Sequence, residues 1–289
     1  MRKSLPHDAE RSSRHSPRPS GIAMIAAARC VRARFYVALV ISSTLGAALP
    51  ATQSFAQSAT EQIAAGDRES VMRHSVLALD HYERALQLEP RNYDALCKAS
   101  REAVDLGEAD ANAGQRSSLY ARATDYAKRA IAVNANDAEA HFHLARALGR
   151  TALTLGAKER VKYAGEIRTQ ALRAIELQPR HAGALHVMGV WNAEVMRLSK
   201  FERLFAKTFL GGAIFSSASW AEAVRYMQEA VNVEPNRLVH RLDLARALRD
   251  SGRTADARLA YQAAIKAPDM DATDDANRRV AQAELNALR

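Results

Sequence analysis

The sequence has little cysteine, glycine, proline or aromatic residue. Its 289 residues include 2 Cys, 13 Gly and 8 Pro, and aromatic residues make up 6% of the chain. Two cysteines exclude a scaffold held by several disulfides and a thiolate-rich zinc site. Few glycines and prolines argue against an all-β sandwich with its many turns, whereas abundant alanine, leucine, arginine and glutamate favour helices. We therefore expect an all-α protein, and the chain is long enough to bury a core.

Motifs of common enzymes are also absent from the sequence. It contains no Walker loop, no GxGxxG after a strand, no HExxH and no GxSxG. The histidines are scattered, and Cys97 has no evident base that would activate it as a nucleophile. The sequence therefore predicts no catalytic residue, no metal ligand and no cofactor.

The positive charge of the chain is concentrated near its start. The formal net charge is +9, and residues 1–56 hold eight lysines and arginines against two acidic residues. Six of the nine net charges thus lie in this segment, while both signs are interleaved in the remainder. A nucleic-acid-binding protein is expected to keep a basic patch in its folded part, so we do not expect nucleic acid as a partner.

The start of the chain has the pattern of a secretory signal peptide. The run Phe35–Leu49 contains no charge, three arginines precede it, and small residues follow it up to Ala56. We predict cleavage after Ala56, which would place the mature protein in the periplasm or outside the cell. If the polar residues 1–23 are not translated, the protein starts at Met24. The alternative is an uncleaved membrane anchor, although a spanning helix needs about 20 apolar residues.

Residues 57–289 contain a recurring helical pattern. A small residue near the end of a helix is followed five positions later by proline, or once by alanine, in four segments: 82–92, 127–137, 171–181 and 227–237. A second pattern with its own small residue follows each of them: 93–107, 138–150, 182–195 and 238–252. The small residues of this second register are Ser100, Ala145, Gly189 and Ala245. Proline ends a helix and a small residue lets two helices approach closely, so each unit is expected to be a helix pair.

Two helices per unit, a small residue in each and a terminal proline resemble the tetratricopeptide repeat. The resemblance implies a right-handed α-solenoid of about five helix pairs in residues 57–289; the alternative is an ordinary helical bundle. In the first pair we expect the turn at Ala65–Asp67 and the second helix at Ser70–Leu88. A polar last helix, Asp274–Leu288, is expected to cap the stack.

The units are longer than the usual 34 residues, which predicts three insertions. The first, Glu108–Ser117, is polar and rich in glycine, asparagine and alanine, so we expect a loop. The second, residues 151–166, is expected to lengthen the two helices that flank Gly156. The third lies near residues 197–219.

Two segments resemble a particular family of tetratricopeptide proteins. Residues His141–Val195 and the sequence FLGGAIFSSASW at 209–220 are similar to the regulator of microtubule dynamics family, and the resemblance extends over about Asp80–Leu288. That family includes a mitochondrial outer-membrane tether whose repeat domain is described as binding and transferring phospholipids. The resemblance therefore implies a helical repeat fold and a role that involves lipid.

The resemblance also implies that the first helix of each pair lines a concave groove. Three of the four residues that follow the small position in these helices are arginines: Arg101, Arg146 and Arg246. Three further residues are expected on the same face: Phe142, His186 and Arg249. Arginine donors suit carboxylate or phosphate, so this face is the predicted ligand groove. The alternative is that these are surface arginines paired with local acids such as Glu102 and Asp243.

The third insertion contains a second candidate site. Its apolar residues follow helical spacing, with lysine and arginine on the other sides of the helix: Phe201, Leu204, Phe205, Phe209 and, after a glycine pair, Phe215. Such a helix can enter a membrane interface or hold acyl chains. It can equally fold back and pack as a plug, since exposed apolar patches of this size are uncommon.

The sequence as a whole predicts a binding protein and not an enzyme. We expect an exported scaffold or adaptor whose concave groove holds a peptide or protein segment. The alternative is a binder or carrier of anionic phospholipid, with peripheral contact to a membrane.

Overall fold

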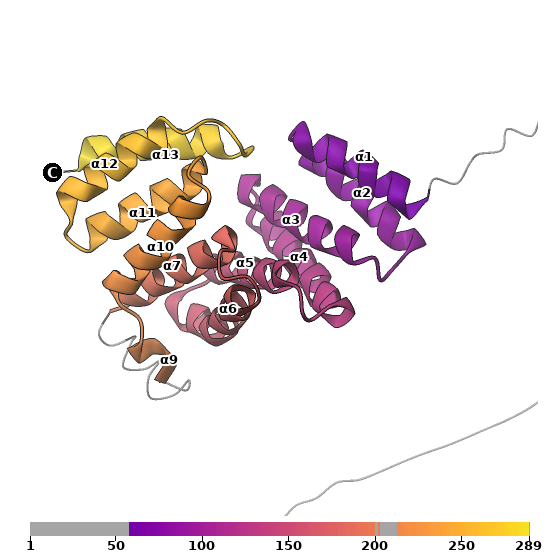
Figure 1. The fold of residues 1–289 in the computed structure, drawn as a ribbon, viewed down its shortest axis with the longest axis horizontal. Coiled ribbons are helices and arrows are strands. Elements are labelled where there is room, and N and C mark those ends of the chain that lie inside the picture. The colour runs from indigo at the N-terminus through magenta and orange to yellow at the C-terminus, as the bar shows by residue number, and fades with distance from the viewer. Residues whose placement is uncertain (1–57, 200–201, 203–212, 289) are drawn as a thin grey trace, which may run out of the picture. The chain divides into compact units, whose positions relative to one another are not determined.

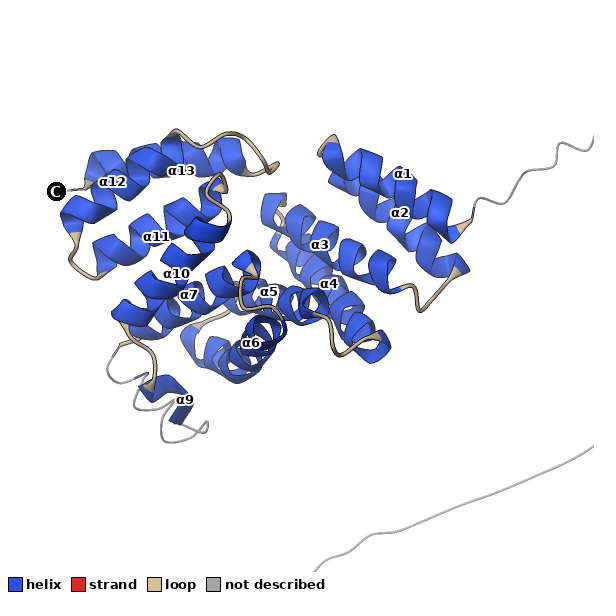
Figure 2. Ribbon diagram, in the orientation of Figure 1, coloured by secondary structure: helices blue, strands red, loops and turns tan. Residues whose placement is uncertain are grey.

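The computed structural model describes residues 58–199, 202 and 213–288. They belong to one compact unit of the chain, Ser54–Arg289. Throughout this described part the regular structure is helical and contains no strand, as predicted (Figure 2). The first helices of the five pairs are α1 (Ala59–Val71), α3 (Tyr93–Ala109), α5 (Ala138–Leu153), α7 (Ala182–Arg197) and α11 (Leu238–Asp250). The second helices are α2 (Ser75–Leu88), α4 (Ala113–Val133), α6 (Ala157–Leu177), α10 (Trp220–Val233) and α12 (Thr254–Ile265).

The pairs stack in chain order as an α-solenoid (Figure 1). Each second helix packs against its own first helix and against the first helix of the next pair. The first helices from α3 onward also contact one another in sequence, which makes them one layer of the stack. The polar helix α13 (Asp274–Ala287) packs against α11 and α12 at the end, as predicted.

The small residues of both predicted registers lie at the helix–helix contacts. Ala85, Ala130, Ala174 and Ala230 are fully buried, as are Ser100, Ala145 and Ala245. The fourth residue of the second register, Gly189, leaves no room for a side chain, because a Cβ there would lie 2.4 Å from Cγ of Met227. These contacts explain the repeat pattern, since a larger side chain at either register would push the paired helices apart.

The first pair differs from the sequence prediction. Ala65–Asp67 lie inside α1, and α2 begins at Ser75 and not at Ser70. A glycine at position 66 makes room for the ring of Tyr82, which packs against it, and the chain does not turn there. The turn is at Met72–His74, where Arg73 has a φ of 63°.

The first two insertions lengthen helices. The predicted loop Glu108–Ser117 was wrong, because α3 extends to Ala109 and α4 begins at Ala113. The side chain of Asn112 caps α4 by accepting hydrogen bonds from the N–H groups of Gly114 and Gln115, at 2.9 and 3.1 Å. The second insertion is as predicted, since α5 and α6 flank Gly156.

Residues 200–201 and 203–212 of the third insertion lie outside the described residues. Four of its predicted apolar residues lie outside the described residues: Phe201, Leu204, Phe205 and Phe209. The short helix α9 (Ala213–Ser216) carries Phe215, which is 6% exposed and stacks on Trp191 with 6.3 Å between ring centroids. No helix among the described residues has the length and hydropathy needed to cross a membrane.

Candidate functional site

The arginine of the second pair is bound to a buried carboxylate. Arg101 on α3 donates from Nε and Nη2 to Oε1 of Glu102, at 3.2 and 3.0 Å, and from Nη2 to Oγ of Ser70 on α1 at 2.9 Å. The side chain of Glu102 is 2% exposed. A carboxylate this deeply buried needs a compensating charge, which Arg101 supplies while joining α3 to α1.

The arginine of the third pair binds two carboxylates of the preceding helix. Nη2 of Arg146 on α5 lies 2.6 Å from Oδ1 of Asp105 and 3.0 Å from Oε1 of Glu108, both on α3. One turn further along α5, Nε of Arg150 lies 2.6 Å from the same oxygen of Glu108. Burial alone would raise the pKa of Glu108, but Arg146 and Arg150 hold that pKa below its usual range. Glu108 therefore keeps its charge at neutral pH, and the cluster joins α5 to α3.

The arginines of the fifth pair bind the capping helix. Arg246 on α11 donates from Nε and Nη2 to Oε1 of Glu284 on α13, at 3.0 and 2.7 Å, and from Nη1 to Oδ1 of Asp243 at 3.0 Å. Arg249 donates from Nη1 to Oε2 of Glu284 at 3.0 Å and to the hydroxyl of Tyr261 at 3.1 Å. These bonds hold α13 against the end of the stack.

A histidine joins the fourth pair to the fifth. Nε2 of His186 on α7 lies 2.9 Å from Oδ2 of Asp243 on α11, and its ring packs on His240 with 4.7 Å between centroids. Burial alone would raise the pKa of Asp243, but His186 and Arg246 hold it well below its usual range. His186 thus has an internal carboxylate partner, like the arginines.

Phe142 packs between the third and fourth pairs. Its ring lies 5.0 Å from the ring of His143 and 4.7 Å from that of His181, the residue that caps α7. A Cβ at Gly183 would lie 2.5 Å from the ring of Phe142, so the glycine allows this close approach. Oε2 of Glu139 lies 3.4 Å from Nε2 of His143, and its Oε1 lies 3.3 Å from Nε2 of His181.

The six predicted groove residues lie on successive first helices, α3, α5, α7 and α11. We call the surface that they form the ladder face and define it by these six residues and their charged partners on α3, α11 and α13. Both ion pairs that the alternative interpretation named, Arg101–Glu102 and Arg246–Asp243, are present. An anionic ligand on the ladder face would consequently compete with internal carboxylates.

The sequence analysis did not identify a second charged register. It lies four residues after the arginine register and carries a charge in every one of these pairs: Asp105, Arg150, Glu194 and Asp250. Three of these residues bind the neighbouring first helix directly: Asp105 binds Arg146, Arg150 binds Glu108 and Asp250 binds Arg197. Helical periodicity alone identifies this register, because residues four apart share a face.

The chemistry of this face is ionic and not nucleophilic. Within the described ranges, no group of three or more His, Cys, Asp or Glu is arranged to hold a metal ion. Burial raises the pKa of the Cys97 thiol to about 12, so the reactive thiolate is scarce at neutral pH.

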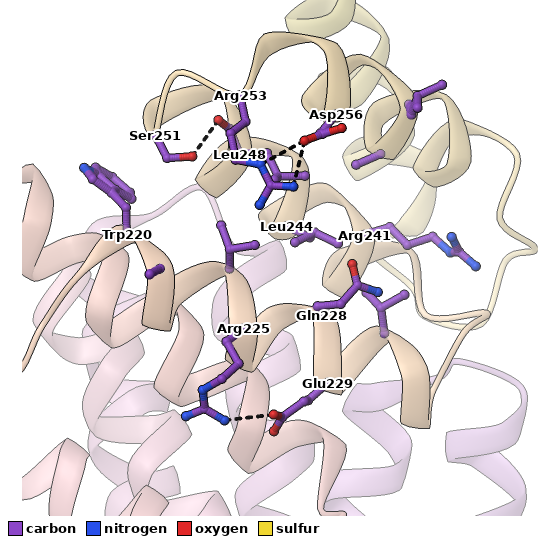
Figure 3. A pocket seen from close by; sticks show the side chains of 15 residues that line it. Trp220, Arg225, Gln228, Glu229, Arg241, Leu244, Leu248, Ser251, Arg253 and Asp256 are labelled. Carbon is purple, nitrogen blue, oxygen red and sulfur yellow. Dashed lines mark hydrogen bonds and ion pairs between the residues drawn. The ribbon is translucent and has the colours of Figure 1, made fainter.

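A separate cleft lies between α10, α11 and α12 (Figure 3). Its volume is about 870 Å³. Apolar residues from all three helices line it: Val224, Val231, Leu244, Leu248 and Ala260. Trp220 and Arg241 lie at opposite ends in Figure 3, and ion pairs such as Arg225–Glu229 form its rim. The sequence analysis did not predict this cleft, because its residues come from three helices in different registers.

The fold and the ladder face together define a right-handed α-solenoid of tetratricopeptide-type helix pairs. A solved structure of a thermophilic tetratricopeptide protein from Thermus thermophilus has the same fold. It aligns with 80% of this chain and 100% of its own, with a TM-score of 0.59 and 19% sequence identity.

The chain belongs to the family described as regulator of microtubule dynamics protein 1-3, whose model matches residues 57–289. Regulator of microtubule dynamics protein 1 from Mus musculus is 30% identical over 141 residues, which are 49% of this chain and 45% of the relative. The Homo sapiens protein is 29% identical over 141 residues, 49% of this chain and 44% of its own. The matched region thus spans about half the length of these relatives.

Proposed function

We propose that this protein is an exported, non-enzymatic binding scaffold whose ladder face holds a peptide or protein segment. The observation that carries the proposal is the charged register Asp105, Arg150, Glu194 and Asp250, which continues through every first helix from α3 to α11. Together with the arginine register it offers donors and acceptors to the backbone and polar side chains of an extended peptide. An acyl chain would find no comparable apolar path along these residues.

The proposal places peptide binding near Gly149, which lies between Arg146 and Arg150 on α5. A Cβ added at Gly149 would meet no atom within 4 Å, so open space lies in front of this residue. A large side chain there would block the ladder face without removing an ion pair. Gly149 therefore offers a way to test binding separately from stability.

The experiment measures fluorescence anisotropy of labelled 12-residue peptides with the full chain. The peptides are acidic, basic, mixed-charge and apolar. The wild type and Gly149→Ala are expected to bind at least one of them equally well, whereas Gly149→Trp should lose at least ten-fold in affinity at an unchanged thermal midpoint. Equal binding by Gly149→Trp would place the peptide elsewhere, and the absence of binding to every peptide would reject the scaffold function.

Export is part of the same proposal. Its support is the apolar run Phe35–Leu49 and the small residues before Ala56, which lie outside the described residues. Cleavage after Ala56 would give a periplasmic or secreted scaffold, and an uncleaved run would tether it to the membrane. Because either outcome takes the repeat domain out of the cytosol, we do not extend the role named for the microtubule regulators to this chain.

A second candidate function is binding of an anionic lipid surface. Four large apolar residues are exposed around the turn between α1 and α2: Val71 by 84%, Met72 by 53%, Val76 by 67% and Leu77 by 50%. Arg73 lies between them, and apolar side chains beside a cation suit a membrane interface. Flotation with phosphatidylglycerol vesicles tests this function. Val71→Ser/Val76→Ser should abolish flotation if it holds, and Leu259→Ser, at another exposed leucine, is the control.

A further inference from the structure

The connection between α12 and α13 touches the opposite end of the repeat stack. We call this connection, residues 266–273, the strap. Nη2 of Arg73, in the turn between α1 and α2, donates a hydrogen bond of 2.8 Å to the carbonyl oxygen of Asp269. The two residues are 196 positions apart in the sequence. In Figure 1 the strap precedes α13 and extends towards α1. The strap therefore links the last helix pair directly to the first.

The backbone of Arg73 is strained in a way that serves this contact. Its φ of 63° lies in the left-handed region, which favours glycine and is unfavourable for residues with a side chain. An arginine occupies the position nevertheless, and its side chain makes the contact with the strap. The left-handed backbone of this turn thus directs the guanidinium of Arg73 towards the other end of the stack.

The strap is acidic and lies among arginines. Four aspartates fall between positions 269 and 275, counting the first two residues of α13. Nη1 of Arg237, at the start of α11, lies 3.1 Å from Oδ1 of Asp271. Asp271 also interacts electrostatically with Asp105 and Arg146 of the ladder face. Burial raises the pKa of Asp271 above its ordinary value, so the nearby arginines compensate its charge only in part.

The contact between the strap and the first pair is weak. The strap itself is ordered by Asp274, whose Oδ2 accepts hydrogen bonds of 2.7 Å from the N–H groups of Met270 and Asp271. The bond from Arg73 is exposed, so water competes for its donor and its acceptor and the net stabilisation is small. Met270 is 50% exposed and Val71 on the other side is 84% exposed, so these apolar side chains do not seal the contact.

We propose that the strap is a displaceable internal ligand and that an acidic peptide segment of a partner replaces Asp271 beside Arg237. This inference rests on the proposed function and specifies its ligand as acidic. The pair of Asp271 with Arg237 shows that a carboxylate fits at this position. Release of the strap, which Arg73 holds through the carbonyl oxygen of Asp269, frees the donors of Arg237 for the partner.

The probe in the test is a peptide with the strap's own sequence. A fluorescein-labelled peptide with the sequence of residues 268–275, PDMDATDD, is titrated with the full chain, and PNMNATNN serves as the uncharged control peptide. Asp271→Asn weakens the strap's pair with Arg237. Asp275→Asn removes the same charge from a residue that is 76% exposed and pairs with Arg278 on its own helix. Arg73→Gln releases the strap from its other end.

Asp271→Asn and Arg73→Gln are expected to bind the acidic peptide at least three-fold more tightly than the wild type. Asp275→Asn should bind it like the wild type, and Asp271→Glu should restore the wild-type affinity. Adding Arg237→Gln to Asp271→Asn should then lower the affinity at least ten-fold. Thermal midpoints of all variants show which of them are folded.

Three results would overturn the inference. They are equal affinities for Asp271→Asn and Asp275→Asn, equal affinities for the acidic and uncharged peptides, and no binding of the acidic peptide to any folded variant. The last result leaves the proposed function intact if another peptide binds the wild type and is lost in Gly149→Trp. If no peptide of any composition binds, the proposed function fails as well.

Discussion

Gly66 and Tyr82 approach so closely that a Cβ at Gly66 would lie 2.5 Å from Cε1 of the tyrosine ring. Tyr82 is fully buried, and its hydroxyl donates a hydrogen bond of 2.8 Å to Oδ1 of Asp67, so the ring cannot move aside freely. The glycine therefore fixes the distance between α1 and α2. The small residues of the other pairs do the same at their own contacts.

This contact predicts opposite effects for two glycine substitutions. Gly66→Ala should lower the free energy of unfolding by about 1–2 kcal/mol, because the steric clash exceeds the gain in helix propensity. Gly149→Ala should raise it by about 0.5–1 kcal/mol, because its added Cβ meets no neighbour. Urea denaturation measures both, and destabilisation of similar size at the two glycines would contradict the packing described for Tyr82.

Two buried histidines predict a loss of stability below neutral pH. Burial lowers the pKa of His143 to about 3 and that of His240 to about 2. Between these values and the unfolded pKa of about 6.5, the unfolded chain binds more protons, so the free energy of unfolding falls as the pH falls. Each histidine should contribute about 1.4 kcal/mol per pH unit below pH 6.5.

Urea denaturation at pH 6.5 and 5.0 measures this dependence of the free energy of unfolding on pH. Both values lie above the range in which most carboxylates titrate. His143→Gln should remove about half of this dependence, provided that the variant is folded at both pH values. Leu259→Ala, at an exposed position without a titratable group, should keep the wild-type slope. A slope unchanged by His143→Gln would mean that this histidine is hydrated in the folded protein.

The end of the third insertion is predicted to be part of the core. Phe215→Ala should lower the free energy of unfolding by about 3–4 kcal/mol, because it removes the ring that stacks on Trp191. Leu259→Ala is the matched control at a side chain that is 65% exposed, and it should change stability by less than about 0.5 kcal/mol. A neutral Phe215→Ala would show that α9 does not pack against α7.

The signal peptide prediction concerns the mature N-terminus. Sequencing of the protein from its native host should begin at Gln57, because Ser54 and Ala56 supply the small residues that signal peptidase requires. Ala56→Glu should block processing and leave a precursor of lower mobility on a gel. A native protein that begins at Met1 or Met24 would favour the uncleaved anchor.

Several features of the fold could be read from the sequence because they depend on contacts that repeat. The small residues at Ala145 and Ala245, the proline stops and the polar last helix each recur or end a periodic pattern. Local backbone chemistry at Gly252, whose φ is 82°, also marks the turn between α11 and α12. These signals act over one or two turns of helix, so neighbouring residues reveal them.

The sequence was least informative where a residue has two compatible environments. Gly66 fits a turn as well as a close helix contact, and only the position of Tyr82 decides between them. The polar stretch at Glu108–Ser117 fits a loop, yet Asn112 caps a helix inside it. In both places the local preference is weak, and tertiary packing determines the structure.

By itself the sequence determined the class of fold and the two registers of small residues, since each follows from helical periodicity. Tertiary structure alone decided which residues of other helices the arginines bind. Arg146 binds Asp105 and Glu108 some forty positions away, and Arg73 reaches Asp269 across the whole stack. Such contacts depend on how successive pairs are rotated against one another, and that rotation is set by the summed packing of many side chains and not by any local pattern.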